Sequence, residues 1–289
     1  MLPTFICPGA QKSATTTLYK ILKQHPDVFL PDRKELKFFS GENWNKGLGW
    51  YQRQFEAYSE QKAVGDITPH YMWTKRAVKR IYDTLGPSVK FIFMLRNPAE
   101  RTFSQYRMDL KSGIVKRSFE ECVEKEISAL TNDKNPVTQY VSNGLYGQQI
   151  EWFLEYYTKE NMYFVLFEDF VRDIEKECAG IFSFLEIEKK PDIDYNIQSL
   201  ADFEPRNLKL YVLTKKIAYG IRKRILTHVK SKKIVRKANR LVGKIIIGKG
   251  ADPLPPPKIS DQEKAALLAF YESDIETLER IISRKGLWK

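Results

Sequence analysis

Short apolar runs that each precede a helical pattern constrain the fold of this chain more than any other feature. The runs are Thr4–Cys7, Lys90–Leu95 and Met162–Phe167, with a weaker one at Ala63–Asp66. The helical patterns are Thr15–Gln24, a segment that begins after Asn97, Tyr146–Tyr157 and about 173–185. Because strands that alternate with helices pair in parallel, the sequence predicts an α/β fold of three layers, with a central parallel sheet flanked by helices.

Length and composition fit one such domain. With 289 residues, of which 43% are apolar, the chain can bury a sizeable core. The longest unbroken apolar run, Ala265–Tyr271, has seven residues, whereas a membrane-spanning helix needs about 20. The sequence shows no signal-peptide pattern, and its three cysteines have neither disulfide nor metal-ligand spacing. We therefore expect a cytoplasmic protein of one domain, residues 1–289, without a metal.

The net charge of +12 comes from one segment. Pro205 to Ala251 contains 15 Lys and Arg residues and no Asp or Glu, so the rest of the chain carries a net charge of −3. Apolar residues recur there at helical spacing, which predicts a basic helical insertion at about 205–250. The run Ala251–Pro257 is typical of a stiff linker, and the capping box that begins at Ser260 predicts a C-terminal helix at about 259–285.

The segment Pro8–Leu22 joins the first expected strand to the first expected helix and has the residues of an anion-binding loop. The first amides of a helix lack intrahelical partners and lie at the positive end of its dipole, so they bind phosphate groups. Gly9 permits a tight turn, and Lys12 adds a full positive charge. The loop is P-loop-like, although a P-loop kinase would have a glycine where Gln11 stands.

Seven blocks of sequence resemble the heparan sulfate type of sulfotransferases that use PAPS (3′-phosphoadenosine 5′-phosphosulfate), and their bacterial relatives. The blocks are PGAQKSATTTL (Pro8–Leu18), QHPDVFLP (Gln24–Pro31), KELKFF (Lys34–Phe39), GLGWY (Gly47–Tyr51), VGDITPHY (Val64–Tyr71), LRNPAERTFSQY (Leu95–Tyr106) and SNGLYGQQIEWFLEYY (Ser142–Tyr157). The resemblance covers roughly residues 4–190. It implies a P-loop-like fold and transfer of a sulfuryl group from PAPS to an acceptor.

The resemblance also implies two contact regions for the donor nucleotide. In the first block, the residues that would hold the 5′-phosphosulfate are Lys12, Ser13, Ala14, Thr15, Thr16 and Thr17. In the sixth block, Arg96 and Ser104 would hold the 3′-phosphate, and Arg101 is expected on the same helix face as Ser104. A late loop closes over the nucleotide in this family, and Lys249-Gly250 is the candidate for it. A 3′-phosphate site would distinguish PAPS from ATP.

Transfer to a hydroxyl group needs a general base, and the resemblance points to Glu35 in the KELKFF block. Lys34 and Lys37 flank this glutamate and would favour its ionised form. Asp66 is a second carboxylate expected near the site. These residues predict a catalytic region in which lysines and carboxylates lie close together.

The chain departs from the family at Ile67, where a lysine is often found. Either Lys12 carries the work of that lysine alone, or His70 or Lys37 substitutes for it. The expected catalytic set is Glu35, Lys12, His70 and Asp66. The expected acceptor contacts are Lys37, Trp50 and Tyr71, since aromatic rings suit sugar stacking.

Three classes of function fit these features. The first is a PAPS-dependent sulfotransferase that releases adenosine 3′,5′-bisphosphate, with a carbohydrate acceptor or, alternatively, a lipid or sterol hydroxyl. The second is a P-loop kinase, and the third is a non-catalytic polyanion-binding protein. The basic helices at 207–250 could attract a polyanionic glycan or lie peripherally on an anionic membrane. The sequence contains no recognised module for specific nucleic-acid binding.

Overall fold

A five-stranded parallel sheet, in the order β2-β3-β1-β4-β5, forms the centre of the computed structural model. The structure describes residues 1–132, 134, 138–190, 192–197, 211–212 and 257–288. The strands are β1 (Phe5–Gly9), β2 (Val28–Phe29), β3 (Ala63–Ile67), β4 (Lys90–Leu95) and β5 (Met162–Leu166). The helices are α1 (Thr15–Leu22), α2 (Gly47–Arg53), α3 (Lys75–Leu85), α4 (Pro98–Ser112), α5 (Phe119–Thr131), α6 (Tyr146–Leu154), α7 (Phe167–Arg172), α8 (Ile174–Phe184) and α11 (Asp261–Ile282).

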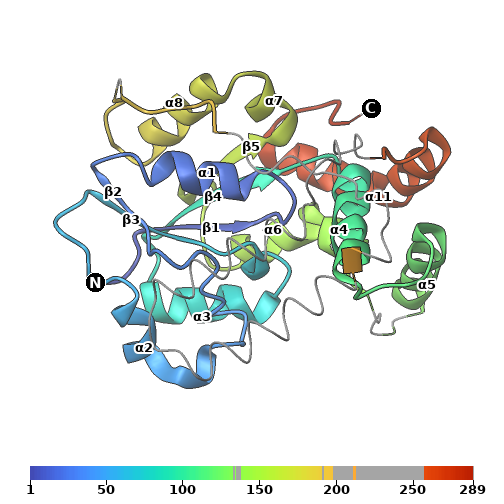
Figure 1. Cartoon of the computed structure of the whole chain (residues 1–289), viewed down its shortest axis with the longest axis horizontal. Helices are drawn as coiled ribbons and strands as arrows, with labels where there is room; N and C mark the ends of the chain where they lie inside the picture. The colour runs from blue at the N-terminus through green and yellow to red at the C-terminus, as the bar shows by residue number, and fades with distance from the viewer. Residues whose placement is uncertain (133, 135–137, 191, 198–210, 213–256, 289) are drawn as a thin grey trace.

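Apolar side chains cover both faces of the sheet, because successive residues of a strand point to opposite sides. On β1, Phe5 and Cys7 belong to the cluster that includes the buried residues of α1 and α8. Ile6 belongs instead to the cluster that includes the buried residues of α3, α6 and α11. Figure 1 shows α1 and α8 on one side of the sheet and α3 on the other. The predicted three-layer α/β fold is therefore confirmed.

The expected strands and helices occur in the structure, and their ends lie within three residues of the expected positions. Helix α4 begins as its sequence predicted: the Asn97 side chain accepts hydrogen bonds from the amides of Ala99 (3.0 Å) and Glu100 (3.2 Å). Within the described residues, no helix is long and apolar enough to cross a membrane. The expected basic insertion at 205–250 lies almost wholly outside the described residues.

Helix α11 returns the end of the chain to the carboxyl edge of the sheet. The Asp274 carboxylate accepts hydrogen bonds from the backbone amides of Gly147 (2.9 Å) and Gln148 (2.8 Å), which lie in the first turn of α6. The Tyr271 hydroxyl donates to the Val141 carbonyl at 2.8 Å. These contacts hold the segment before α11 beside α4 (Figure 1), where part of the site described below is built.

Gly9 ends β1 at a point where the chain passes very close to Met72. A Cβ added to Gly9 would lie 2.6 Å from the Met72 Cβ and sulfur atoms, closer than side chains can approach. The glycine is thus needed for this close approach, not for the tight turn that the sequence suggested.

We expect Gly9→Ala to destabilise the protein by roughly 1–3 kcal/mol, the usual cost of overpacking a core. Thermal unfolding measures this as a lowered midpoint. Gly49→Ala is the matched control, since a Cβ there meets only Arg53, at 3.7 Å. Equal melting temperatures for Gly9→Ala and the wild type would contradict the expectation.

Candidate active site

The loop between β1 and α1 has a backbone conformation that L-residues rarely adopt. Lys12 and Ala14 have φ angles of 73° and 62°. Such residues cost free energy and cluster at functional sites, where the surrounding structure holds them. Ala14 occupies the N-cap position of α1 and gives its first amides no side-chain acceptor. The geometry therefore matches the predicted anion-binding loop.

Ser13 provides the most direct sign of a ligand in this loop. It is fully buried, and its Oγ atom has no hydrogen-bond partner. Buried polar groups in proteins are almost always hydrogen-bonded, so this hydroxyl is positioned to donate to something else. Of the threonines that follow, Thr15 and Thr17 are buried and Thr16 is exposed. An anion at the start of α1 would satisfy Ser13.

Arg96 connects the loop to the end of β4. Its guanidinium group donates to the Lys12 carbonyl at 3.3 Å, pairs with Glu100 at 3.3 Å and lies 4.4 Å from the ring centre of Phe167. The Nε atom of Arg96 is buried without a partner. The arginine is thus fixed from three sides and keeps an unused donor, as a preorganised anion contact would.

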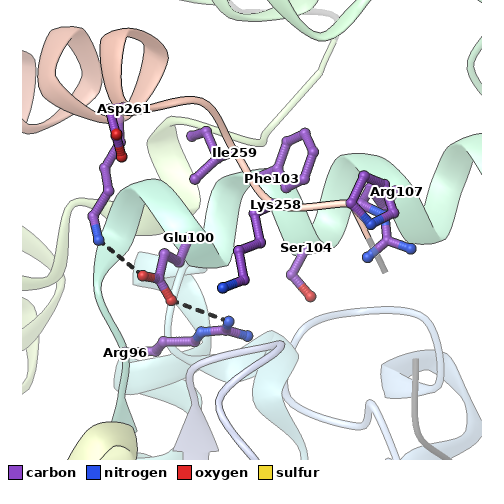
Figure 2. A pocket seen from close by; sticks show the side chains of 10 residues that line it. Arg96, Glu100, Phe103, Ser104, Arg107, Lys258, Ile259 and Asp261 are labelled. Atoms are coloured by element: carbon purple, nitrogen blue, oxygen red, sulfur yellow. Dashed lines mark hydrogen bonds and ion pairs between the residues drawn. The ribbon is translucent and has the colours of Figure 1, made fainter. Parts of the chain in front are cut away.

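A pocket of about 410 Å³ adjoins Arg96 between α4 and the segment before α11. The residues that line it are Arg96, Glu100, Phe103, Ser104, Arg107, Pro257, Lys258, Ile259, Asp261 and Lys264. Figure 2 shows these side chains converging, with Lys258 between Glu100 and Ser104. Glu100 is already neutralised by Arg96 and by Lys264, whose Nζ lies 2.9 Å away. Four cations and two carboxylates, Glu100 and Asp261, line the pocket, and this excess of positive charge favours a negatively charged ligand.

The structure both corrects and extends the expected 3′-phosphate set. Ser104 lines the pocket, whereas Arg101, which was expected on the same helix face, does not. Arg101 is fully buried and donates to the Tyr140 carbonyl, because its side of α4 faces the core. Arg107, one turn after Ser104, lines the pocket where Arg101 was expected.

Two lysines of the C-terminal segment were missed by the sequence reasoning. Lys258 and Lys264 line the pocket because α11 docks on α4 and α6. The predicted nucleotide loop at Lys249-Gly250 lies outside the described residues. The pocket is thus completed from the end of the chain, a few residues after the predicted loop.

Glu35 lies beside the anion-binding loop, held by a second stretch of unusual backbone. Glu35 and Lys37 have φ angles of 61° and 50°. The Lys34 Nζ atom lies 3.0 Å from the Glu35 carboxylate and 3.4 Å from the Thr15 hydroxyl. Burial is the largest single influence and raises the pKa of Glu35, but Lys34, His70 and Lys37 together outweigh it, so the pKa lies below its ordinary value of 4.5. Glu35 is therefore an ionised carboxylate at neutral pH, linked to the loop through Lys34.

His70 lies on the far side of Glu35 from Lys34. Its Nδ1 atom is 3.8 Å from the Glu35 carboxylate, is buried and makes no hydrogen bond. Burial and the positive charge of Lys37 lower the pKa of His70 below 6.5. A neutral imidazole and an ionised carboxylate thus face one another across a distance too long for a direct hydrogen bond.

Asp66 is not an accessible second carboxylate. It is 1% exposed and accepts hydrogen bonds from the hydroxyls of Tyr51 (2.9 Å), Thr68 (2.6 Å) and Tyr71 (2.9 Å). Burial raises its pKa above 3.8, and these three donors oppose the rise. Asp66 is thus far less accessible than Glu35, whose side chain is one-third exposed, and a catalytic role for Asp66 stays a prediction.

A second pocket, of about 510 Å³, opens on the side of His70. Its lining residues are Gln11, Ser40, Glu42, His70, Trp73, Thr74, Gln105, Met108, Asp109, Ile114, Thr138, Gln139, Tyr140 and Asn143. Two buried polar atoms in this lining, Ser40 Oγ and His70 Nδ1, have no partner. The pocket reaches the anion-binding loop through Gln11.

The expected acceptor contacts fit this second pocket only in part. Tyr71 is fully buried with its hydroxyl on Asp66, and it does not line this pocket. Trp50 packs on Phe38 and lies outside the lining. Lys37 borders the pocket through Glu42, whose carboxylate is 2.9 Å from the Lys37 amine. Trp73 supplies the aromatic surface instead.

Comparison with known proteins identifies the family. The sequence model of the sulfotransferase domain family matches residues 3–237, so the chain belongs to this family. The chain is 35% identical over 138 residues to the membrane-associated sulfotransferase kil1 of Dictyostelium discoideum, a match covering 45% of this chain and 29% of that protein. It is 30% identical over 188 residues to heparan sulfate glucosamine 3-O-sulfotransferase 3A1 of Mus musculus, covering 65% of this chain and 47% of that protein. The matches thus span less than half of either relative.

A solved structure supports the fold independently. The sulfotransferase from Alicyclobacillus acidocaldarius superposes with a TM-score of 0.71 at 24% sequence identity. The superposition covers 99% of this chain and 98% of that one. The three-layer architecture is therefore that of a known sulfotransferase.

Proposed function

We propose that this chain transfers a sulfuryl group from PAPS to a hydroxyl or amino group of a carbohydrate. The observation that carries the proposal is the pair of anion sites joined by Arg96, which touches the Lys12 carbonyl and lines the pocket with Ser104. Two separate anion sites suit a nucleotide with charged groups on both its 5′ and 3′ oxygens. A kinase substrate such as ATP leaves the second site without a ligand.

The residues present fit PAPS. Ser13 and Arg96 each hold a buried donor atom without a partner, one at each end of the proposed site. Lys12, Ser13 and the first amides of α1 would bind the 5′-phosphosulfate, while Arg96, Ser104 and Arg107 would bind the 3′-phosphate. The donor supplies the sulfuryl group and leaves as adenosine 3′,5′-bisphosphate.

Glu35 is the residue that would take the proton from the acceptor. Its carboxylate is ionised, one-third exposed, and lies between Lys34 and the acceptor-side pocket. Lys34 reaches both Glu35 and Thr15, so it can supply the positive charge that Ile67 lacks. His70, which lines the pocket, would position the acceptor next to Glu35.

Nucleotide binding tests the proposal directly. Adenosine 3′,5′-bisphosphate at a hundredfold excess over Kd should increase the free energy of unfolding by roughly 2.7 kcal/mol. This stabilisation is measured as a higher melting temperature. ATP at the same concentration, with magnesium, should raise it far less. A shift with ATP alone would favour the kinase alternative, and no shift with either nucleotide would favour the polyanion-binding one.

The pH dependence of kcat/KM should distinguish Glu35 from His70 as the base. A base works in its deprotonated form, so activity falls as the pH drops through its pKa. If Glu35 is the base, the acidic limb should lie below 4.5, the ordinary pKa from which Lys34 lowers it. If His70 is the base, the limb should follow the pKa of His70 instead, which burial and Lys37 lower from 6.5. We expect the first profile in initial-rate measurements with saturating donor.

A further inference from the structure

The pocket beside His70 (the acceptor-side pocket) differs in charge from the pocket beside Arg96 (the donor pocket). Four of the residues that line the donor pocket are Lys or Arg, whereas none of the described residues that line the acceptor-side pocket is. The acceptor-side lining contains two carboxylates, Glu42 and Asp109. A ligand entering it meets neutral or acidic groups.

The cations nearest to this lining are already engaged. Lys37 pairs with Glu42 at 2.9 Å. Arg101, behind the pocket, is fully buried and donates to Gln105 at 2.6 Å and to the Tyr140 carbonyl. Lys12 belongs to the donor loop, where its charge would serve the phosphosulfate. A carboxylate or sulfate on the acceptor would therefore meet no Lys or Arg among the described lining residues and would be repelled by the Asp109 carboxylate.

The uncharged part of the lining suits a sugar. Amide and hydroxyl side chains make up eight of the 14 lining residues: Gln11, Gln105, Gln139, Asn143, Ser40, Thr74, Thr138 and Tyr140. Such groups both donate and accept, as sugar hydroxyls do. The half-buried ring of Trp73, 4.8 Å from that of His70, adds an aromatic wall beside the unpartnered Nδ1 atom. A sterol would instead need a mostly apolar lining.

We propose that the acceptor is a neutral carbohydrate, without carboxylate or sulfate on the sugar that enters the acceptor-side pocket. The inference rests on the proposed sulfotransferase function and narrows its acceptor. It separates this chain from the relatives named for heparan sulfate, because that glycan is a polyanion.

The test compares acceptors that differ only in charge. Neutral hexasaccharides of glucose, galactose, mannose and N-acetylglucosamine are incubated with radiolabelled PAPS, each beside the same oligosaccharide oxidised to uronates. A cholesterol arm tests the sterol alternative. We expect at least one neutral sugar to be sulfated with a kcat/KM about tenfold above that of its oxidised form, equivalent to one misplaced charge costing about 1.4 kcal/mol.

A charge placed in the lining should change this preference. Gln139→Lys adds a cation to an exposed lining position, so it should lower the ratio of KM for the oxidised sugar to KM for the neutral sugar. Gln148→Lys, exposed on α6 outside the lining, is the matched control and should change neither. Trp73→Ala should raise KM for the neutral sugar without changing the Kd for adenosine 3′,5′-bisphosphate.

The outcomes separate the two proposals. Failure to bind adenosine 3′,5′-bisphosphate in calorimetry would overturn the sulfotransferase function itself. Normal bisphosphate binding with preference for oxidised sugars, with sulfation of cholesterol alone, or with no sulfation of any neutral sugar would overturn only the neutral acceptor. An equal effect of Gln139→Lys and Gln148→Lys would show that the pocket does not select the acceptor.

Discussion

Replacing Glu35 by glutamine is expected to lower kcat by roughly 10²–10⁴, the usual contribution of a general base. Glutamine keeps the size of the side chain but removes the charge and the proton-accepting oxygen pair. The carboxylate lies on the acceptor side of Lys34, so the Kd for adenosine 3′,5′-bisphosphate should stay near the wild-type value. The measurement is kcat with saturating PAPS and acceptor, together with calorimetric titration of the bisphosphate.

Two further variants make this expectation specific. Glu56→Gln, at an exposed position, removes the same charge elsewhere and should leave kcat unchanged. His70→Asn keeps a polar side chain but removes the imidazole, and we expect it to raise KM for the acceptor more than it lowers kcat. If Glu35→Gln were as active as wild type while His70→Asn lost kcat, the histidine would be the base.

Strands buried on both faces were the easiest part of the fold to predict. Strand β4 contains the unbroken apolar run Phe91–Leu95, and Asn97-Pro98 after it carries its own helix signal, so both β4 and the start of α4 follow from local sequence. Strand β2 has only two residues, Val28–Phe29, too few for any periodic pattern. Helix α3 has a buried face of Ala77, Val78 and Ile81 within a charged segment, and this pattern was overlooked.

The residues of the candidate site also divide into those that local sequence predicts and those that depend on tertiary packing. Ser13, Arg96 and Glu35 lie in short motifs whose chemistry is local, and the structure brings them together at one edge of the sheet. Lys258 and Lys264 had no such signal, because their position depends on how α11 docks on α4. The two helices are more than a hundred residues apart in the sequence. The motif that placed Asp66 near the site could not reveal that three hydroxyls enclose it. Burial of that kind is decided by tertiary packing.

Replacing Arg96 by alanine is expected to weaken binding of adenosine 3′,5′-bisphosphate by about 100-fold. Hydrogen bonds to charged groups contribute about 1.5–3 kcal/mol each, and a guanidinium can make two to one phosphate. Arg96 also donates to the Lys12 carbonyl at 3.3 Å, so its loss should loosen the anion-binding loop as well. Glu100 keeps Lys264 as a partner, which limits the effect on folding. Calorimetry gives the Kd, and thermal unfolding without ligand checks the fold.

A donor analogue without the 3′-phosphate isolates the contribution of Arg96 to that group. Wild-type protein should bind adenosine 3′,5′-bisphosphate much more tightly than adenosine 5′-monophosphate, and Arg96→Ala should bind the two nearly alike. Arg96→Lys keeps the charge but not the forked geometry, so it should restore only part of the preference. Arg172→Ala, which removes a side chain that is 75% exposed, should leave the preference intact. If Arg96→Ala kept the wild-type preference, the 3′-phosphate would have to bind elsewhere, and the two anion sites would no longer belong to one nucleotide.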